Sequence, residues 1–309
     1  MLTNDEVIWG HRYILGRDPE SIAVLDRHKR DYPDWRNFRQ ALLNSSEFAG
    51  GRIDRASESK WVATSIFGGE RLIWLDLADS FVSRGCLFDA YEPIETALVR
   101  QHLTAGDVFL DIGANIGWFS LLASTIIGPS GHVHAFEPRT PTVDYLRRSI
   151  SMNGLESAIT VHDVGLDNGD GEQFLAWVKD TPNPGHSMVM SSITEEGMDS
   201  IRIRLMTLDS LKIPRVDFVK IDVEGAEMRV LEGGATTISR NRPIVLSEVY
   251  PDQLMRVSGA SPSDFFSWFL NHGYRAFVAD AVRTGEEIDG FPPDWHKELM
   301  NVLLLPNPS

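Results

Sequence analysis

Cysteine is nearly absent from this chain: Cys86 is the single one among 309 residues. One cysteine cannot form an intrachain disulfide, and it excludes a metal site built from several thiolates. Because a free cysteine usually behaves as a small buried apolar residue, we expect Cys86 near the core. Disulfide-stabilised folds and cysteine–metal folds are therefore excluded.

Basic residues are also few. The chain has 29 lysines and arginines against 44 aspartates and glutamates, which gives a formal net charge of −15. An acidic surface repels phosphate backbones. The two short basic runs, residues 28–30 and 147–148, read as solvated helix faces. We predict that nucleic acid is not a partner.

Long hydrophobic runs are missing as well. The longest apolar stretch, residues 116–127, is interrupted by glycine, serine and threonine, and it is shorter than the roughly 20 residues that a membrane-spanning helix needs. The first residues, Met-Leu-Thr-Asn-Asp-Glu, lack the basic segment and apolar run of a signal peptide. These absences predict a cytoplasmic protein with no membrane span.

What is present divides into three parts. Residues 1–52 predict a small module of three short helices, with the last two near 21–29 and 35–43, and Gly50-Gly51 marks its end. This module could dock a partner or support self-association. In residues 53–103 we expect a hairpin, with strands at 71–75 and 80–83 around a turn near Asp79, and then a helix at 93–102.

Strands and helices alternate through residues 104–309. This alternation predicts an α/β domain with a mainly parallel sheet that helices cover on both faces. The expected strands are 108–112, 132–136, 159–164, 216–221, 243–249, 274–278 and 302–305, and the expected helices are 118–127, 140–152, 226–232 and 262–271.

A glycine-containing loop follows the first strand of this domain, in the run from Asp111 through Gly113, Ala114 and Asn115 to Gly117. Glycines let a backbone turn tightly and approach a ligand closely, which a Cβ would prevent. Such a loop lies at the carboxyl edge of the sheet, where open α/β folds bind ligands. The spacing fits neither G-x-G-x-x-G nor a P-loop, so pyrophosphate binding has no support.

Glu137 follows the second strand directly. An acid at this place in a nucleotide-binding fold can accept hydrogen bonds from both ribose hydroxyls. The alternative is a first-turn acid that the helix dipole favours. The glycine loop before Glu137, at the right spacing, favours ribose binding.

Five short motifs make the sequence from about residue 70 to 305 resemble the FkbM family of methyltransferases. The resemblance implies a class I methyltransferase fold, which is Rossmann-like, with S-adenosylmethionine as donor and usually O-methylation of sugars or natural products. Residues 1–52 fall outside it. The motifs are residues 91–93 (YEP), 106–117 (GDVFLDIGANIG), 136–138 (FEP), 207–211 (TLDSL) and 220–227 (KIDVEGAE).

The resemblance also implies a set of cofactor-binding residues. Gly113, Ala114 and Gly117 would border the methionine part, Glu137 the ribose, and Asp163 the adenine. The full predicted set is Glu92, Asp111, Gly113, Ala114, Asn115, Gly117, Glu137, Asp163 and Asp222.

Transfer of a methyl group to a hydroxyl requires that the hydroxyl proton leave, so we expect a base or a metal. Asp222 follows a strand at the cofactor edge and is one candidate base. His186, in a proline- and glycine-rich segment that could cover the substrate, is the other, since histidine titrates near neutral pH. Glu224 and Glu248 are candidate substrate contacts, and Glu227 reads as a first-turn acid.

A divalent metal is possible on Asp222 and Glu248, because hard cations favour carboxylates. No third ligand is evident in the sequence, so we favour a metal-free reaction. Three hypotheses stay open: O-methylation of a sugar or natural-product hydroxyl, methylation of a carboxylate or an amine on the same core, and a non-catalytic protein that keeps the fold. The acids at positions 111, 137 and 222 argue against the third.

Overall fold

The computed structural model describes residues 2–4, 7–8, 11, 19, 21–43, 45, 61–77, 79, 81–179, 187–190, 197–280, 284–292 and 299–308. His186 and most of the expected first helix lie outside these residues.

An eight-stranded sheet forms the centre of the molecule, in the order β13-β12-β14-β11-β10-β3-β4-β5. The five strands from β11 to β5 run parallel, and β14 is inserted antiparallel between β11 and β12. The predicted α/β fold with a mainly parallel sheet is therefore confirmed. The strands are β3 (Val108–Ile112), β4 (His132–Phe136), β5 (Ile159–His162), β10 (Phe218–Ile221), β11 (Ile244–Val249), β12 (Tyr274–Val278), β13 (Glu287–Ile288) and β14 (Met300–Pro306).

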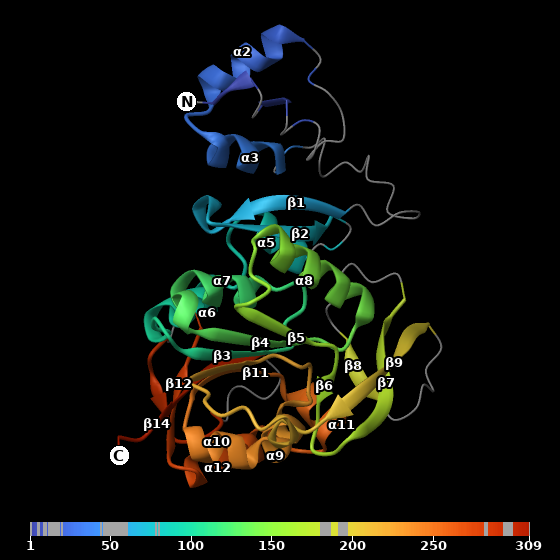
Figure 1. The fold of residues 1–309 in the computed structure, drawn as a ribbon, viewed down its shortest axis with the longest axis vertical. Helices are drawn as coiled ribbons and strands as arrows, with labels where there is room; N and C mark the ends of the chain where they lie inside the picture. The colour runs from blue at the N-terminus through green and yellow to red at the C-terminus, as the bar shows by residue number, and fades with distance from the viewer. Residues whose placement is uncertain are drawn as a thin grey trace.

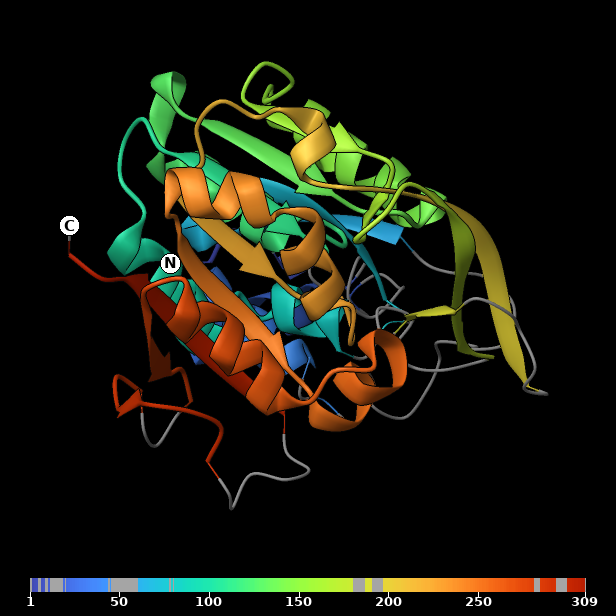
Figure 2. The ribbon, with the colours of Figure 1, turned by 90° about the horizontal axis from the view of Figure 1, so that it is seen from below.

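Helices cover both faces of this sheet, as Figures 1 and 2 show. One face carries α6, α7 and α8, and the other carries α9, α10 and α12, with α11 beside α9. The helices are α6 (Pro93–His102), α7 (Trp118–Ile126), α8 (Thr140–Met152), α9 (Glu227–Gly233), α10 (Ala235–Asn241), α11 (Pro251–Ser258) and α12 (Pro262–Asn271).

Side chains alternate between these two faces along each central strand. Phe109 and Phe218 pack in the core under α6, α7 and α8, whereas Leu110 and Val219 pack in the core on the other side. By the same alternation Asp111 and Lys220, which are register partners on β3 and β10, belong to the face of Phe109. Two charged residues therefore interrupt an otherwise apolar layer next to α7.

The expected hairpin in residues 53–103 is wrong in its second strand. The strand β2 (Arg71–Asp76) pairs antiparallel with β1 (Trp61–Ile66) instead, and residues 82–87 form the helix α5 (Val82–Leu87). Asp79 explains the difference, because its carboxylate accepts hydrogen bonds from the backbone N–H groups of Phe81 and Ser83 at 2.8 and 2.9 Å. Ser83 lies in the first turn of α5, so Asp79 accepts from an N–H group that the helix itself leaves unpaired.

A second, four-stranded sheet in the order β6-β9-β7-β8 was not expected from the sequence. Its long pair is antiparallel and extends beyond the main sheet in Figure 2. The run Ile201-Arg202-Ile203-Arg204-Leu205 alternates apolar and basic residues, which is the pattern of a half-exposed strand. The strands are β6 (Gly165–Leu166), β7 (Gly171–Val178), β8 (Met188–Met190) and β9 (Met198–Met206).

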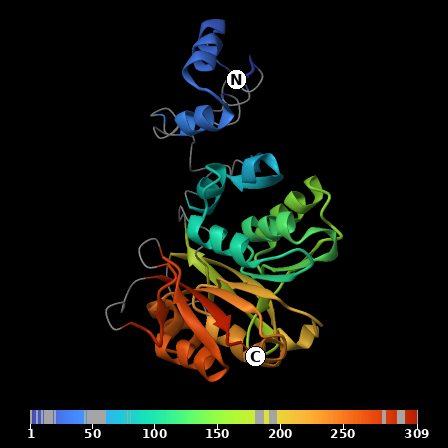
Figure 3. The same ribbon diagram turned by 90° about the vertical axis from the view of Figure 1, so that its left-hand side faces the viewer.

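Near the N-terminus the described residues include α2 (Ile22–Asp31) and α3 (Trp35–Leu43), as the sequence predicts. Figure 3 shows them beyond β1 and β2, at the end of the molecule opposite the C-terminal helices. The Arg39 guanidinium of α3 donates a hydrogen bond to the carbonyl of Cys86 at 3.3 Å. Cys86 itself is buried, as expected, and burial raises the pKa of its thiol. Among the described helices, none has the length and apolar character to cross a membrane.

Candidate active site

A cavity of about 390 Å³ lies at the carboxyl ends of β3, β4, β10 and β11. This is the edge at which open α/β sheets bind ligands, and the volume suits a drug-sized molecule. Of the residues singled out in the sequence, seven line it: Glu92, Gly113, Asn115, Glu137, Asp222, Glu224 and Glu248. Phe136, Val164, Leu166 and Leu175 supply apolar wall.

The glycine loop after β3 forms part of this wall. Gly113 has φ +87°, and its N–H donates to the carbonyl of Phe136 at 3.0 Å. A Cβ at Gly113 would lie 1.8 Å from the carbonyl oxygen of Asp222. The sequence suggested that glycine is needed for close approach to a ligand, but the structure shows a close approach to the loop after β10. This glycine therefore joins two loops of the site.

Ala114 and Gly117 shape the loop without lining the cavity. Ala114 is buried in the core, and Gly117 has φ +97° directly before α7. A Cβ at Gly117 would lie 2.4 Å from the side chain of Leu146 on α8. Any role of these two residues toward a cofactor would act through the loop backbone.

Glu137 lies in the cavity wall beside the glycine loop. Its carboxylate accepts hydrogen bonds from the N–H groups of Asn115 at 3.0 Å and Arg139 at 2.9 Å. Burial raises the pKa of Glu137 to about 7, although these two hydrogen bonds oppose the increase. A carboxylate has about four acceptor positions, so two stay available for hydroxyl groups of a ligand.

Besides Ala114 and Gly117, two more residues of the predicted cofactor set do not line the cavity. The carboxylate of Asp111 is buried and accepts a hydrogen bond from the Ser120 hydroxyl of α7 at 2.6 Å. Asp163 pairs with Arg147 at 2.7 Å and lines a separate hollow with Arg204. The residue that lines the cavity wall at this point is the next one, Val164.

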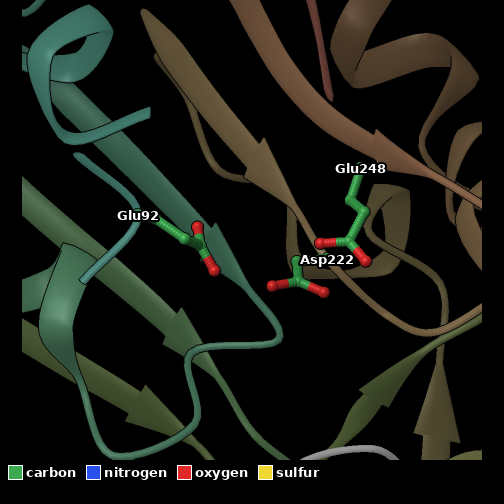
Figure 4. Close-up of side chains that lie close together, drawn as sticks. All are labelled: Glu92, Asp222 and Glu248. Atoms are coloured by element: carbon green, nitrogen blue, oxygen red, sulfur yellow. The ribbon is translucent and has the colours of Figure 1, made fainter. Parts of the chain in front are cut away.

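Three carboxylates converge at the other end of the cavity (Figure 4). One oxygen each from Glu92, Asp222 and Glu248 lies within 4.8 Å of the others. The prediction that no third carboxylate accompanies Asp222 and Glu248 is therefore wrong. Glu92 is the third, and it comes from the segment before α6, more than a hundred residues from Asp222. Burial raises the pKa of Glu92 to about 7.

Lys220 lies beneath these carboxylates and was not singled out in the sequence. Its side chain is 6% exposed, and its Nζ is 2.9 Å from Asp222 Oδ2 and 3.7 Å from Glu92 Oε2. The ammonium also lies 4.5 Å from the ring centre of Phe119. Burial alone would lower the pKa of Lys220, but the charges of Asp222, Glu92 and Asp111 outweigh burial and raise it. A lysine within a short apolar central strand is the sequence feature that could have identified it.

Glu224 and Glu227 belong to the turn after β10. Glu224 lines the cavity with a left-handed φ of +53°. Glu227 is buried in the first turn of α9, as its interpretation as a first-turn acid predicts, and its carboxylate accepts from the N–H of Gly225 at 3.0 Å. This contact holds the turn that presents Asp222.

The fold and its cavity define a class: an α/β protein with the strand arrangement of the class I methyltransferases. The particular family is given by a family model, described as the methyltransferase FkbM domain, which matches residues 111–276. The chain therefore belongs to the FkbM methyltransferase domain family, and the resemblance drawn from the five motifs is confirmed.

Several named relatives are methyltransferases. The chain is 27% identical over 171 residues to the hexuronic acid methyltransferase AglP of Haloferax volcanii, covering 54% of this chain and 63% of that protein. It is 29% identical over 164 residues to the methyltransferase sdnD of Sordaria araneosa, covering 43% and 62%. The matched part thus spans less than two thirds of either relative.

Solved structures also show similarity to the chain. A methyltransferase FkbM from Methylobacillus flagellatus KT is 14% identical, with a TM-score of 0.43 over 96% of this chain and 58% of that one.

Proposed function

We propose that this protein is an S-adenosylmethionine-dependent O-methyltransferase that acts on a hydroxyl of a sugar or natural-product acceptor. The observation that carries the proposal is one cavity with two chemically different ends, at the ligand-binding edge of an FkbM-family domain. Glu137 and apolar side chains form one end, and the carboxylates of Glu92, Asp222 and Glu248 form the other.

The first end fits the donor. Glu137 can accept hydrogen bonds from both ribose hydroxyls, and the apolar wall of Val164, Leu166 and Leu175 suits an adenine ring. Gly113 and Asn115 also line the cavity. They follow β3, which lies between β4 and β10 in the sheet, so the methionine part would extend past them toward the carboxylates. S-adenosylmethionine, when bound, supplies an electrophilic methyl group on a positively charged sulfur. Holding donor and acceptor in line contributes most of the acceleration, up to roughly 7–11 kcal/mol.

The carboxylate end of the cavity helps to distinguish O-methylation from carboxyl and amine methylation. A carboxylate acceptor would be repelled by the acids there, which disfavours carboxyl methylation. An amine acceptor is the second candidate, because the same acids would attract a cationic amine. A neutral sugar also suits them, since carboxylates accept hydrogen bonds from hydroxyls.

Labelled methyl transfer to a panel of neutral methyl hexopyranosides, amino sugars and uronic acids tests the proposal. We expect methylation of a neutral sugar, with less on uronic acids. Transfer only to amines would support the second candidate. Absence of binding to S-adenosylhomocysteine, measured by calorimetry, would contradict the donor assignment itself.

Glu137→Ala should weaken S-adenosylhomocysteine binding by about 1.5–3 kcal/mol, because it removes a buried charged acceptor from two ribose hydroxyls. Calorimetry on the wild type and the variant measures this. Glu172→Ala, an exposed glutamate on β7, is the matched control and should bind normally. Unchanged affinity in Glu137→Ala would contradict the ribose assignment.

Activity should survive EDTA. Three carboxylates could hold a divalent ion, but the Lys220 ammonium already contacts two of them and would repel a second cation at this distance. Lys220 thus supports the metal-free route for a reason that the sequence did not reveal. Turnover measured before and after EDTA checks this. Complete loss, restored by magnesium or manganese, would contradict the metal-free route and make Glu248 a metal ligand.

Two further assignments remain proposals. We propose that residues 1–52 are a separate module for docking or self-association, with 53–103 leading into the methyltransferase domain at 104–309. His186 remains a proposed base, and it lies outside the described residues.

A further inference from the structure

We propose that Glu248 is the catalytic base, the group that takes the proton from the acceptor hydroxyl. This inference rests on the proposed function and names the residue that completes it. Three geometric features support it: the direction in which the Glu248 side chain points, the ion pairs of the two neighbouring carboxylates, and the position of Glu248 in the cavity wall.

Glu248 comes from β11 and points toward Asp222, as Figure 4 shows. It lines the cavity together with Tyr250, which follows the same strand, and with Leu299. The carboxylate therefore faces the space next to the donor end, where an acceptor has to enter. A general base must be within hydrogen-bond reach of the proton that it removes.

The other two carboxylates of the cluster have a cation and Glu248 does not. The ammonium of Lys220 pairs with Asp222 and approaches Glu92. Within the described part of the chain, the structure gives Glu248 neither an ion pair nor a side-chain hydrogen bond. An acceptor hydroxyl that donates to Glu248 would supply the partner that this carboxylate lacks.

The surroundings of Glu248 make it a stronger base than an ordinary carboxylate. Burial first, and then the charges of Asp222, Glu224 and Glu92, raise the pKa of Glu248 well above its usual value, and Lys220 opposes them only in part. A base whose pKa approaches the working pH transfers protons more efficiently than one that is fully ionised far below it.

Methyl transfer and loss of the hydroxyl proton belong to one proposed step. The acceptor oxygen forms a bond to the methyl carbon, and the carbon–sulfur bond breaks with its electron pair staying on sulfur. The hydroxyl proton passes to the Glu248 carboxylate. The products are the methyl ether, neutral S-adenosylhomocysteine and a protonated Glu248, which then returns its proton to water.

The first experiment needs no acceptor. A carboxyl whose pKa is raised in the folded state binds a proton there but not in the unfolded state. The folded state therefore loses stability as pH rises from the unfolded pKa through the folded one. Glu248→Gln removes this loss. From about pH 5, just above the unfolded pKa of a glutamate, to about pH 9, the melting temperature of the variant should therefore fall by roughly 2–4 °C less than that of the wild type.

Two control variants accompany the melting measurements. Glu286→Gln, an exposed glutamate, should leave the wild-type pH dependence unchanged. Asp222→Asn should lower the melting temperature, because it removes a partner of Lys220. An unchanged pH dependence in Glu248→Gln would overturn the proposal, since Glu248 would then be an ordinary carboxylate.

The second experiment measures turnover on the methyl hexopyranoside that the wild type methylates best. Glu248→Gln should lower turnover by roughly 10²–10⁴-fold and leave S-adenosylhomocysteine affinity within about twofold. Wild-type turnover should increase with pH up to the raised pKa of Glu248, and this slope should be absent in the variant. Full activity in Glu248→Gln would overturn the assignment. So would a loss of this size in His186→Ala that Glu248→Gln does not show. A wild type that binds the donor product but methylates no sugar would contradict the proposed function instead.

Discussion

Lys220→Met is expected to destabilise the folded protein by about 3–5 kcal/mol, because it leaves the buried Asp111 and the partly buried Asp222 and Glu92 without their cation. Among the residues that the structure describes, the Lys220 ammonium is the cation that lies against both Asp222 and Glu92. Methionine keeps much of the length and apolar character of the side chain, so the loss should come from the charge. Urea denaturation at pH 7.5 measures it.

Lys179→Met provides the matched control. Lys179 is exposed at the end of β7, and its replacement should change the free energy of unfolding by less than about 0.5 kcal/mol. Adding Asp222→Asn to Lys220→Met should restore part of the stability, because it removes one of the unpaired charges. If Lys220→Met lost less than 1 kcal/mol, the cluster would not depend on this lysine.

Gly113→Ala is expected to cost about 2–5 kcal/mol of stability and to abolish measurable donor binding. The backbone at Gly113 is left-handed, with φ +87°, and an added Cβ would overlap the carbonyl oxygen of Asp222 at 1.8 Å. Backbone atoms on both sides leave no flexible side chain to move away. One loop or the other has to shift, and both line the cavity. Urea denaturation and calorimetry with S-adenosylhomocysteine measure the two effects.

Gly154→Ala separates strain from overlap. Gly154 also has a left-handed backbone, with φ +64°, but nothing lies within 4 Å of its added Cβ. Its replacement should cost about 1 kcal/mol and leave donor binding unchanged. Equal losses in the two variants would show that left-handed strain, rather than contact between the two loops, determines the effect at Gly113.

Much of the α/β domain could be predicted because its pattern is local. Each central strand is a short apolar run, and each is followed by a loop or a helix with recognisable end residues. The glycine loop and Glu137 were predicted for the same reason, since both follow a strand directly. The second sheet was not predicted, although residues 201–205 alternate apolar and basic side chains, because alternation indicates a half-exposed strand but does not show which strand it pairs with.

The hairpin in residues 53–103 failed for a different reason. Residues 80–83 resemble a strand in composition, but the Asp79 carboxylate accepts hydrogen bonds from two backbone N–H groups at the beginning of α5. Side-chain capping competes with strand pairing, and the sequence pattern did not show which of them dominates. The strand partner of β2 instead precedes it in the chain, at residues 61–66.

The α/β class, the family, the edge of the sheet that forms the site and the position of Glu137 could all be predicted from the residues. Each of these depends on residues close together in the chain. The folded molecule was needed to show that Glu92 joins Asp222 and Glu248, and that Lys220 pairs with two of the three. These residues lie on separate segments, and spacing along the chain carries no information on distances across the sheet. Which of these charges has an ion-pair partner depends on how the segments pack together.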